Sequence, residues 1–243
     1  MITDSPFLSI VIPAYKEETR LRKTLPEFLN FAAVSKKPVE LIFVDDGSPD
    51  NTSKVIQEEI KNLENARLVR LPVNQGKGAA IREGMLSARG KFRIFADADN
   101  STPIWQAEKL IEMADDKTVI IGSRYVSGSR IKKKQSFYRV IGGRFLNLFT
   151  QIILLPGIRD TQCGFKLFPQ RAVEQIFPKL RLTRFSFDLE ALSLAKAFGY
   201  RIKEVPIEWE DSPHSTVSPI KDGLKFLTDA IKIKMYLMRR DYQ

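Results

Sequence analysis

This 243-residue sequence has one cysteine and one histidine, and it contains no long hydrophobic run. The lone Cys163 excludes a disulfide framework within the chain and favours a reducing compartment. We expect no secretory leader, because no basic segment followed by a signal-length apolar stretch opens the sequence. No apolar run approaches the roughly 18 residues of a membrane span, so we expect no membrane-spanning helix. The lone His214, in DSPHST, is interpreted as a surface residue rather than a catalyst.

Charge is abundant and unbalanced. Lysine and arginine number 39 against 29 aspartates and glutamates, a formal net charge of +10. A basic surface suits nucleic acid, an anionic membrane or phosphorylated substrates. No helix-turn-helix, ribonucleoprotein or zinc pattern is present, so we expect no nucleic-acid partner.

Strand and helix patterns alternate along the first half of the chain. Apolar, β-branched runs predict strands at 7–15, 39–44, 66–74, 91–99 and 117–125. Helical spacing follows these strands at 17–35, where Pro26 favours a start near that residue, and at 52–60, 76–90 and 103–116. Repeated strand-helix units predict an α/β fold with a mostly parallel, Rossmann-like sheet flanked by helices.

The second half is less regular. Residues 127–139 predict a mobile loop rich in glycine, serine and lysine, and 140–158 and 185–200 predict helices. A strand is expected at 201–209, and a basic amphipathic helix at 223–240. We expect one domain over residues 1–211, with 212–243 forming a C-terminal amphipathic helix of the same structural unit, suited to a membrane interface.

Two pairs of carboxylates stand where strands should end, Asp45-Asp46 and Asp97-Ala98-Asp99. Ligands of parallel α/β sheets bind outside the carboxyl ends of the strands. Carboxylates there can serve acid-base chemistry, bind Mg²⁺ or Mn²⁺, or cap the following turn. An isolated pair would favour the cap, but two pairs at one edge need compensation by cations or hydrogen-bond donors.

A nucleotide diphosphate bound through a metal would supply that compensation. The nearest bases are Lys77 and Arg124, and Arg124 could alternatively pair with Asp97 or Asp99 to relieve their repulsion. No Walker phosphate loop occurs, and GKGAAIREG does not follow its strand closely enough for a dinucleotide fingerprint. The residues therefore favour a nucleotide-diphosphate ligand with Mg²⁺ or Mn²⁺.

A family resemblance rests on five segments in order: SIVIPAYKEE, FVDDGSPDNT, NQGKGAA, ADADNSTP and GSRY. Together they resemble a family 2 glycosyltransferase of GT-A fold, over residues 7–209. The chain is most similar to the members that make polyprenyl-phosphate sugars. RDTQCGFKLF and FSFDLEAL resemble dolichyl-phosphate β-glucosyltransferases, involved in protein glycosylation, more than the related mannose synthases.

The resemblance implies roles for individual residues. Asp97, Asp99 and Arg124 would be catalytic, and Asp99 would bind the metal. Ser101 stands where mannose synthases carry a metal-binding glutamine, so a second protein ligand is left open. Arg124 and Arg139 would hold the acceptor phosphate. The nucleotide-sugar site would comprise Pro13, Ala14, Tyr15, Glu17, Val44, Asp46, Lys77, Asp97, Ala98 and Asp99.

The implied reaction is inverting transfer of a hexose, expected to be glucose from UDP-glucose, to a polyprenyl or dolichyl phosphate. A phosphate is already an anionic nucleophile at neutral pH and needs little or no general base. We expect the protein at the cytoplasmic face of a membrane as a peripheral protein. Alternatives are a GDP-mannose-dependent enzyme, a transferase to a soluble sugar hydroxyl with Asp188 or Glu190 as base, and a non-catalytic nucleotide-sugar-binding module.

Overall fold

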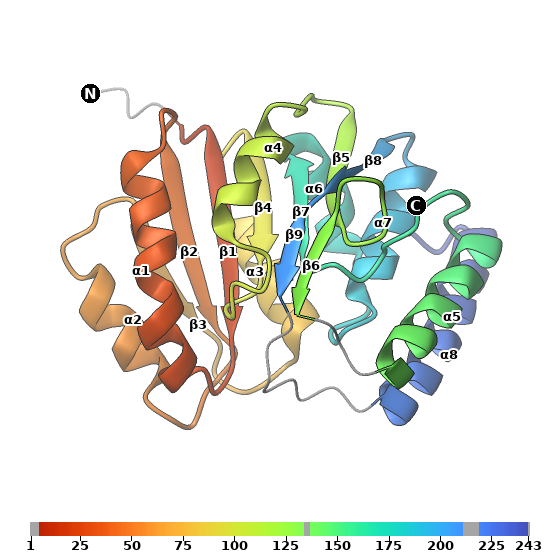
Figure 1. The fold of residues 1–243 in the computed structure, drawn as a ribbon, viewed down its shortest axis with the longest axis horizontal. Coiled ribbons are helices and arrows are strands. Elements are labelled where there is room, and N and C mark those ends of the chain that lie inside the picture. The colour runs from red at the N-terminus through yellow and green to blue at the C-terminus, as the bar shows by residue number, and fades with distance from the viewer. Residues whose placement is uncertain (1–4, 134–136, 211–218, 243) are drawn as a thin grey trace.

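The computed structural model describes residues 5–133, 137–210 and 219–242. Seven strands form one sheet in the order β3-β2-β1-β4-β7-β5-β8 (Figure 1). Six run parallel, and β7 is antiparallel to both β4 and β5, so the prediction of a mostly parallel α/β sheet is confirmed. The strands are β1 (Leu8–Ala14), β2 (Val39–Asp45), β3 (Ala66–Arg70), β4 (Phe92–Ala96), β5 (Thr118–Ser123), β7 (Phe165–Pro169) and β8 (Arg201–Pro206).

Helices cover both faces of the sheet. One face is covered by α1 (Glu18–Val34), α2 (Thr52–Ile60) and α4 (Ala107–Ile111), which pack on the sheet through Leu21, Val55 and Leu110, respectively. The short 3-10 turn η1 (Ile104–Gln106) precedes α4. The other face is covered by α3 (Lys77–Ser87), α6 (Gln170–Ile176) and α7 (Phe187–Ala197), with the 3-10 turn η2 (Phe177–Lys179) after α6. Every residue of β1, β2, β4 and β5 is consequently buried, as apolar runs of parallel strands require.

Pro26 lies inside α1 and does not start it. The helix begins eight residues earlier, at Glu18, and its buried face includes Leu21, Leu25 and Phe28. Packing of that face on the sheet offsets the backbone hydrogen bond that proline removes. The expectation of a helix start near Pro26 is therefore wrong.

Part of the expected mobile loop is a strand. Residues of β6 (Arg130–Lys133) pair in parallel with β9 (Glu208–Glu210) in a separate two-stranded sheet. The Lys132 ammonium also contacts the Glu208 carboxylate at 2.9 Å. A partner 78 residues further along cannot be read from the composition of the loop itself.

Two long helices lie side by side at one end of the molecule (Figure 1). They are α5 (Phe137–Ile153) and α8 (Pro219–Met238), and α8 also contacts α7. The domain boundary expected at residue 211, and His214, lie outside the described residues. Within the described ranges, neither these helices nor any other is long and apolar enough to cross a membrane.

Candidate active site

Asp46, directly after β2, anchors the start of α3. Its carboxylate accepts hydrogen bonds from the backbone N–H groups of Gln75 (2.7 Å) and Gly76 (2.8 Å) and from the Asn74 amide (2.8 Å). Gly76 has φ of +105°, and a Cβ there would lie 2.5 Å from the Thr183 carbonyl oxygen. Only glycine fits this turn. Burial raises the pKa of Asp46, although the two backbone donors oppose the shift.

Asp45 is compensated by hydrogen-bond donors rather than by a ligand. Its carboxylate accepts from the Ser48 backbone N–H at 3.0 Å and from the Ser53 hydroxyl, with the Arg70 guanidinium 3.6 Å away. The side chain is fully buried. Asp45 therefore fixes the turn between β2 and α2, which is the capping role left open for such residues.

Asp97, directly after β4, pairs with Lys77 at the first position of α3. The ammonium nitrogen lies 2.5 Å from one carboxylate oxygen. Although burial opposes it, the carboxylates of Asp97 and Asp188 hold the pKa of Lys77 above its ordinary value. Gly164 passes so close to the Asp97 carboxylate that a Cβ there would overlap it. The glycine of the CGF segment thus makes room for Asp97.

Asp99 is engaged differently. The Ser101 backbone N–H donates to its carboxylate at 3.0 Å, and within the described ranges Asp99 forms no ion pair. The turn is shaped by Asn100, whose φ is +51°, and the Thr24 hydroxyl donates to the Ala98 carbonyl at 2.7 Å. Asp46, Asp97 and Asp99, at the ends of β2 and β4, form what we call the acidic rim. Within the described residues Asp46 accepts three hydrogen bonds and Asp97 pairs with Lys77, whereas Asp99 accepts one hydrogen bond and is the least engaged of the three.

The carboxylates of this rim fit a divalent cation whose remaining coordination positions are filled by a bound ligand. In the part of the chain that the structure describes, no group of three acidic, histidine or cysteine side chains could enclose a metal. Magnesium is commonly held by one or two carboxylates together with substrate phosphates. Asp99 can supply such a carboxylate.

The end of β1 faces the same rim. Tyr15 is 39% exposed beside it, whereas Pro13 and Ala14 are buried in the strand. Burial raises the pKa of Glu17 to about 7, and Asp99 and Asp97 add to the shift while Arg20 opposes it. The ends of β1 and β4 are therefore close enough to interact electrostatically.

Val44, one residue before the end of β2, can offer only its backbone to a ligand at the rim. Its side chain is fully buried, and a Cβ at Gly84 of α3 would lie 2.8 Å from a Val44 methyl group. That methyl group therefore packs against α3. Ala98, which is 5% exposed, similarly offers little side-chain surface to a ligand.

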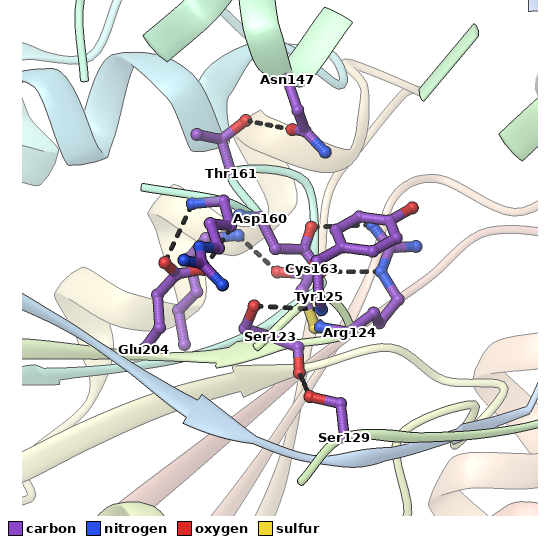
Figure 2. A network of polar contacts seen from close by, with 11 residues as sticks. Ser123, Arg124, Tyr125, Ser129, Asn147, Asp160, Thr161, Cys163 and Glu204 are labelled. Carbon is purple, nitrogen blue, oxygen red and sulfur yellow. Dashed lines mark hydrogen bonds and ion pairs between the residues drawn. The ribbon is translucent and has the colours of Figure 1, made fainter. Parts of the chain in front are cut away.

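Arg124, directly after β5, is held by Asp160 (Figure 2). Its Nε and Nη2 groups donate to the two carboxylate oxygens at 2.8 Å each, and its backbone N–H donates at 2.9 Å. The guanidinium also lies 5.4 Å from the ring centres of Tyr125 and Trp209. Despite burial, Arg124 holds the pKa of Asp160 below its ordinary value. The alternative that Arg124 pairs with Asp97 or Asp99 is wrong.

The loop that carries Asp160 is tied to the strands and helices around it. The backbone N–H groups of Arg159 and Asp160 each donate to the Glu204 carboxylate of β8 at 2.9 Å. Figure 2 also shows the Thr161 hydroxyl donating to Asn147 of α5, at 3.3 Å. Burial raises the pKa of the Cys163 thiol to about 12, which fits a buried structural cysteine. The side chain of Arg139 lies outside what the structure describes.

Asp188 has a buried partner that the sequence analysis missed. The Lys166 ammonium, fully buried in β7, contacts the Asp188 carboxylate at 3.0 Å and donates to the Cys163 carbonyl. Burial raises the pKa of Asp188, and Lys166 and Lys77 oppose the shift. A lysine inside the apolar run GFKLF was the available signal, because a buried lysine needs a carboxylate partner.

The rim thus gathers carboxylates from the ends of β2 and β4 around one lysine, Lys77. Residues 9–177 match the model of the family described as "Glycosyl transferase family 2". The chain belongs to this family and is a glycosyltransferase.

Curated relatives match almost the whole chain. The dolichyl-phosphate beta-glucosyltransferase of Dictyostelium discoideum is 34% identical over 97% of this chain and 76% of its own length. The enzyme of the same name from Saccharomyces cerevisiae is 36% identical over 96% of this chain and 75% of its own length.

Solved structures share the fold. Mannosyl-3-phosphoglycerate synthase from Rubrobacter xylanophilus superimposes with a TM-score of 0.69 at 15% identity, covering 97% of this chain and 75% of that one. Glucosyl-3-phosphoglycerate synthase from Mycobacterium tuberculosis, in complex with Mn²⁺ and UDP-glucose, gives 0.63 at 18% identity, covering 95% and 78%. These likenesses confirm the GT-A fold.

Proposed function

We propose that this protein transfers glucose from UDP-glucose to the phosphate of dolichyl phosphate or a related polyprenyl phosphate, with inversion to a β-linked product. The observation that carries the proposal is the similarity, over at least 96% of the chain, to enzymes named dolichyl-phosphate beta-glucosyltransferase. The acidic rim supports it, because carboxylates that can hold a metal suit a diphosphate better than a free sugar. A non-catalytic binding module would be expected to lose Asp97 or Asp99, and both are present.

The donor would lie across the ends of β1, β2 and β4. Tyr15, Glu17 and Asp46 would line the base and ribose pocket, with the backbone of Pro13, Ala14, Val44 and Ala98 forming its floor. Lys77 lies 2.5 Å from Asp97 and would shift toward the donor diphosphate when it binds. A lysine in this position suits the donor diphosphate, since its ammonium group is a compact point charge.

Asp99 would hold the divalent cation, Mg²⁺ or Mn²⁺. When bound, the metal neutralises negative charge that develops on the leaving diphosphate. A role for the Ser101 hydroxyl as a further ligand is part of the proposal, and the Ser101 backbone N–H already orients Asp99. Asp97 would hold Lys77 in place and meet the donor ribose.

The acceptor phosphate would attack the anomeric carbon opposite the nucleotide. No general base is needed, because the phosphate is ionised at neutral pH. The candidate bases of the hydroxyl-acceptor alternative are both engaged: Asp188 pairs with Lys166, and Glu190 accepts three hydrogen bonds. Arg124 and Arg139 are proposed to bind the acceptor phosphate, Arg124 with its orientation fixed by Asp160.

We also place α5 and α8 against the membrane that holds the acceptor. Three exposed apolar side chains share one face of α5: Phe145, Leu148 and Ile152, which are 58%, 56% and 75% exposed. On α8 an equivalent row is formed by Leu224, Ile231, Met235 and Met238. Exposed lysines and arginines flank this row, each contributing about 1 kcal/mol near an anionic leaflet.

An activity screen tests the reaction. Purified protein is incubated with dolichyl phosphate in detergent, Mg²⁺ or Mn²⁺, and radiolabelled UDP-glucose or GDP-mannose. We expect label from UDP-glucose in a β-linked, mild-acid-labile lipid product. Faster transfer from GDP-mannose, or transfer only to a soluble sugar hydroxyl, would contradict the assignment.

Vesicle flotation tests the membrane face. Replacing Phe145 and Ile152 by serine should abolish binding to vesicles of phosphatidylcholine and phosphatidylserine. The matched control replaces Val34 and Val73, which are 63% and 62% exposed elsewhere, and should bind normally. Equal binding by both variants would argue against this face.

A further inference from the structure

Glu190 is a buried carboxylate that the proposed reaction does not use. It lies on α7 and is fully buried. One oxygen accepts the backbone N–H groups of Arg181 (3.0 Å) and Leu182 (2.9 Å). The other accepts the Tyr242 hydroxyl at 2.6 Å. Glu190 therefore ties the segment before α7 to the residues that follow α8.

Tyr242 is held there by more than its hydroxyl. The side chain packs edge-on against Tyr236 of α8, with ring centres 5.9 Å apart. The Arg181 guanidinium lies 4.7 Å from the Tyr236 ring centre and 5.3 Å from that of Tyr242, and its Nη2 donates to the Asp241 carbonyl at 2.7 Å. A second tie joins the same parts, since the Ser186 hydroxyl donates to Asp229 of α8 at 2.7 Å.

The segment so anchored, residues 181–187, forms the wall behind the start of α3. The Thr183 carbonyl accepts the Ala79 backbone N–H at 3.1 Å. A Cβ at Gly76 would meet the Thr183 oxygen, and a Cβ at Gly78 would lie 2.7 Å from Phe187. The turn of Gln75 and Gly76, which donates to Asp46, and the first turn of α3, which begins with Lys77, thus both rest directly on this wall.

We propose that Tyr242 and Glu190 are positioning residues for the donor site. They hold residues 181–187 against Gly76 and Gly78, and through this wall they set where Lys77 and the Gly76 N–H lie. The inference rests on the proposed function in one respect, namely that the rim binds the nucleotide diphosphate of the donor. It adds that α8, the helix we place at the membrane, is connected to that rim.

The test variant is Tyr242→Phe, which keeps the ring and removes the hydrogen bond to Glu190. Tyr200→Phe is the matched control, because the Tyr200 hydroxyl donates to Gln175 at 2.7 Å on an exposed surface. In Tyr242→Phe we expect the dissociation constant of UDP with Mn²⁺, measured by calorimetry, to rise about three- to tenfold. The KM for dolichyl phosphate should change less than twofold, and the control should match wild type in both.

Amide hydrogen exchange provides a readout that needs no ligand. The amides of Gln75, Gly76 and Ala79 should exchange faster in Tyr242→Phe than in wild type or Tyr200→Phe. Unchanged exchange at these amides, or an equal increase in the control, overturns the inference. If the wild type binds no UDP, the proposed donor is wrong, while the exchange rates still decide the role of Tyr242.

Discussion

Two ion pairs stand at the same edge of the sheet and differ in nearly every physical respect. Lys77 and Asp97 meet through a single 2.5 Å contact, with side chains 25% and 36% exposed. Arg124 and Asp160 share two side-chain hydrogen bonds and a backbone one, with side chains 13% and 0% exposed.

The difference separates a pair that can open toward a ligand from a pair that holds its arginine in a fixed orientation. A partly exposed pair with a single contact loses little free energy when one partner turns to a ligand, since water and the ligand replace the broken contact. A buried pair cannot do so, because a buried charge without its partner is very costly. We infer that Lys77 and Asp97 respond to the donor, whereas Asp160 keeps Arg124 and its backbone fixed.

The largest expected effect comes from breaking the buried pair. Asp160→Asn should lower the free energy of unfolding by about 3–5 kcal/mol, because it leaves the Arg124 charge buried without a counter-charge. Denaturant titration measures the loss. Asp115→Asn is the control, since Asp115 pairs with Arg201 at 2.8 Å on the exposed surface and should cost about 0–1 kcal/mol. Equal losses would erase the distinction between buried and exposed pairs.

Removing the Asp99 carboxylate should lower turnover and leave the stability of the fold nearly unchanged. Asp99→Ala should reduce turnover by about 10²- to 10³-fold, the scale of losing one charge-stabilising group. Its unfolding free energy should change by less than about 0.5 kcal/mol, because the Ser101 N–H can turn to water. Undiminished turnover of this variant in excess Mn²⁺ would rule out Asp99 as the metal ligand.

The partly exposed pair, Lys77 and Asp97, should respond through donor affinity. Lys77→Met should weaken UDP binding by about 10- to 100-fold, the value of a hydrogen bond to a charged group. The acceptor KM should stay the same, which initial-rate kinetics with each substrate varied in turn will show. Lys91→Met, at an exposed lysine 3.7 Å from Asp116, is the control and should bind UDP normally. A change confined to the acceptor KM would contradict a role for Lys77 in donor binding.

The smallest effect is a pH dependence of the buried pair. Because Arg124 lowers the pKa of Asp160 in the folded state, the pair stabilises the fold fully above the unfolded carboxyl pKa, about 3.9. That stabilisation is lost as pH falls through the lower folded pKa. The stability gap between wild type and Asp160→Asn should therefore stay constant from pH 8 to 5 and shrink only below about pH 4. A gap that narrows between pH 8 and 6 would point to a different titrating group.

Local patterns predicted much of the fold. The apolar runs predicted as strands at 39–44 and 91–99 match β2 and β4, and Lys77, one of the two bases expected near the acidic pairs, meets Asp97 in the structure. These successes share one cause: the carboxyl ends of parallel strands lie at one edge whatever the details of packing.

Long-range pairing could not be predicted. Asp160 is 36 residues from Arg124, and no local pattern names it as the partner. Strand β7 is also hard to predict, because a lysine in a five-residue run argues against a buried strand. Only the contact between Lys166 and Asp188 explains why that lysine can be buried. The donor role of Lys77 and the metal role of Asp99 are predictions that the variants above test.

The reversed strand β7 also constrains the order in which the chain can assemble during synthesis. Strands β3, β2, β1 and β4 are neighbours in the sheet and are all translated by residue 96. Strand β5 has no place beside them, because β7 lies between β4 and β5. The ribosome makes β7 roughly 40 residues after β5, a delay of about 2–8 s at about 5–20 residues per second. During that interval the apolar β5 segment lacks its neighbouring strand and can aggregate, while the first four strands can already be folding.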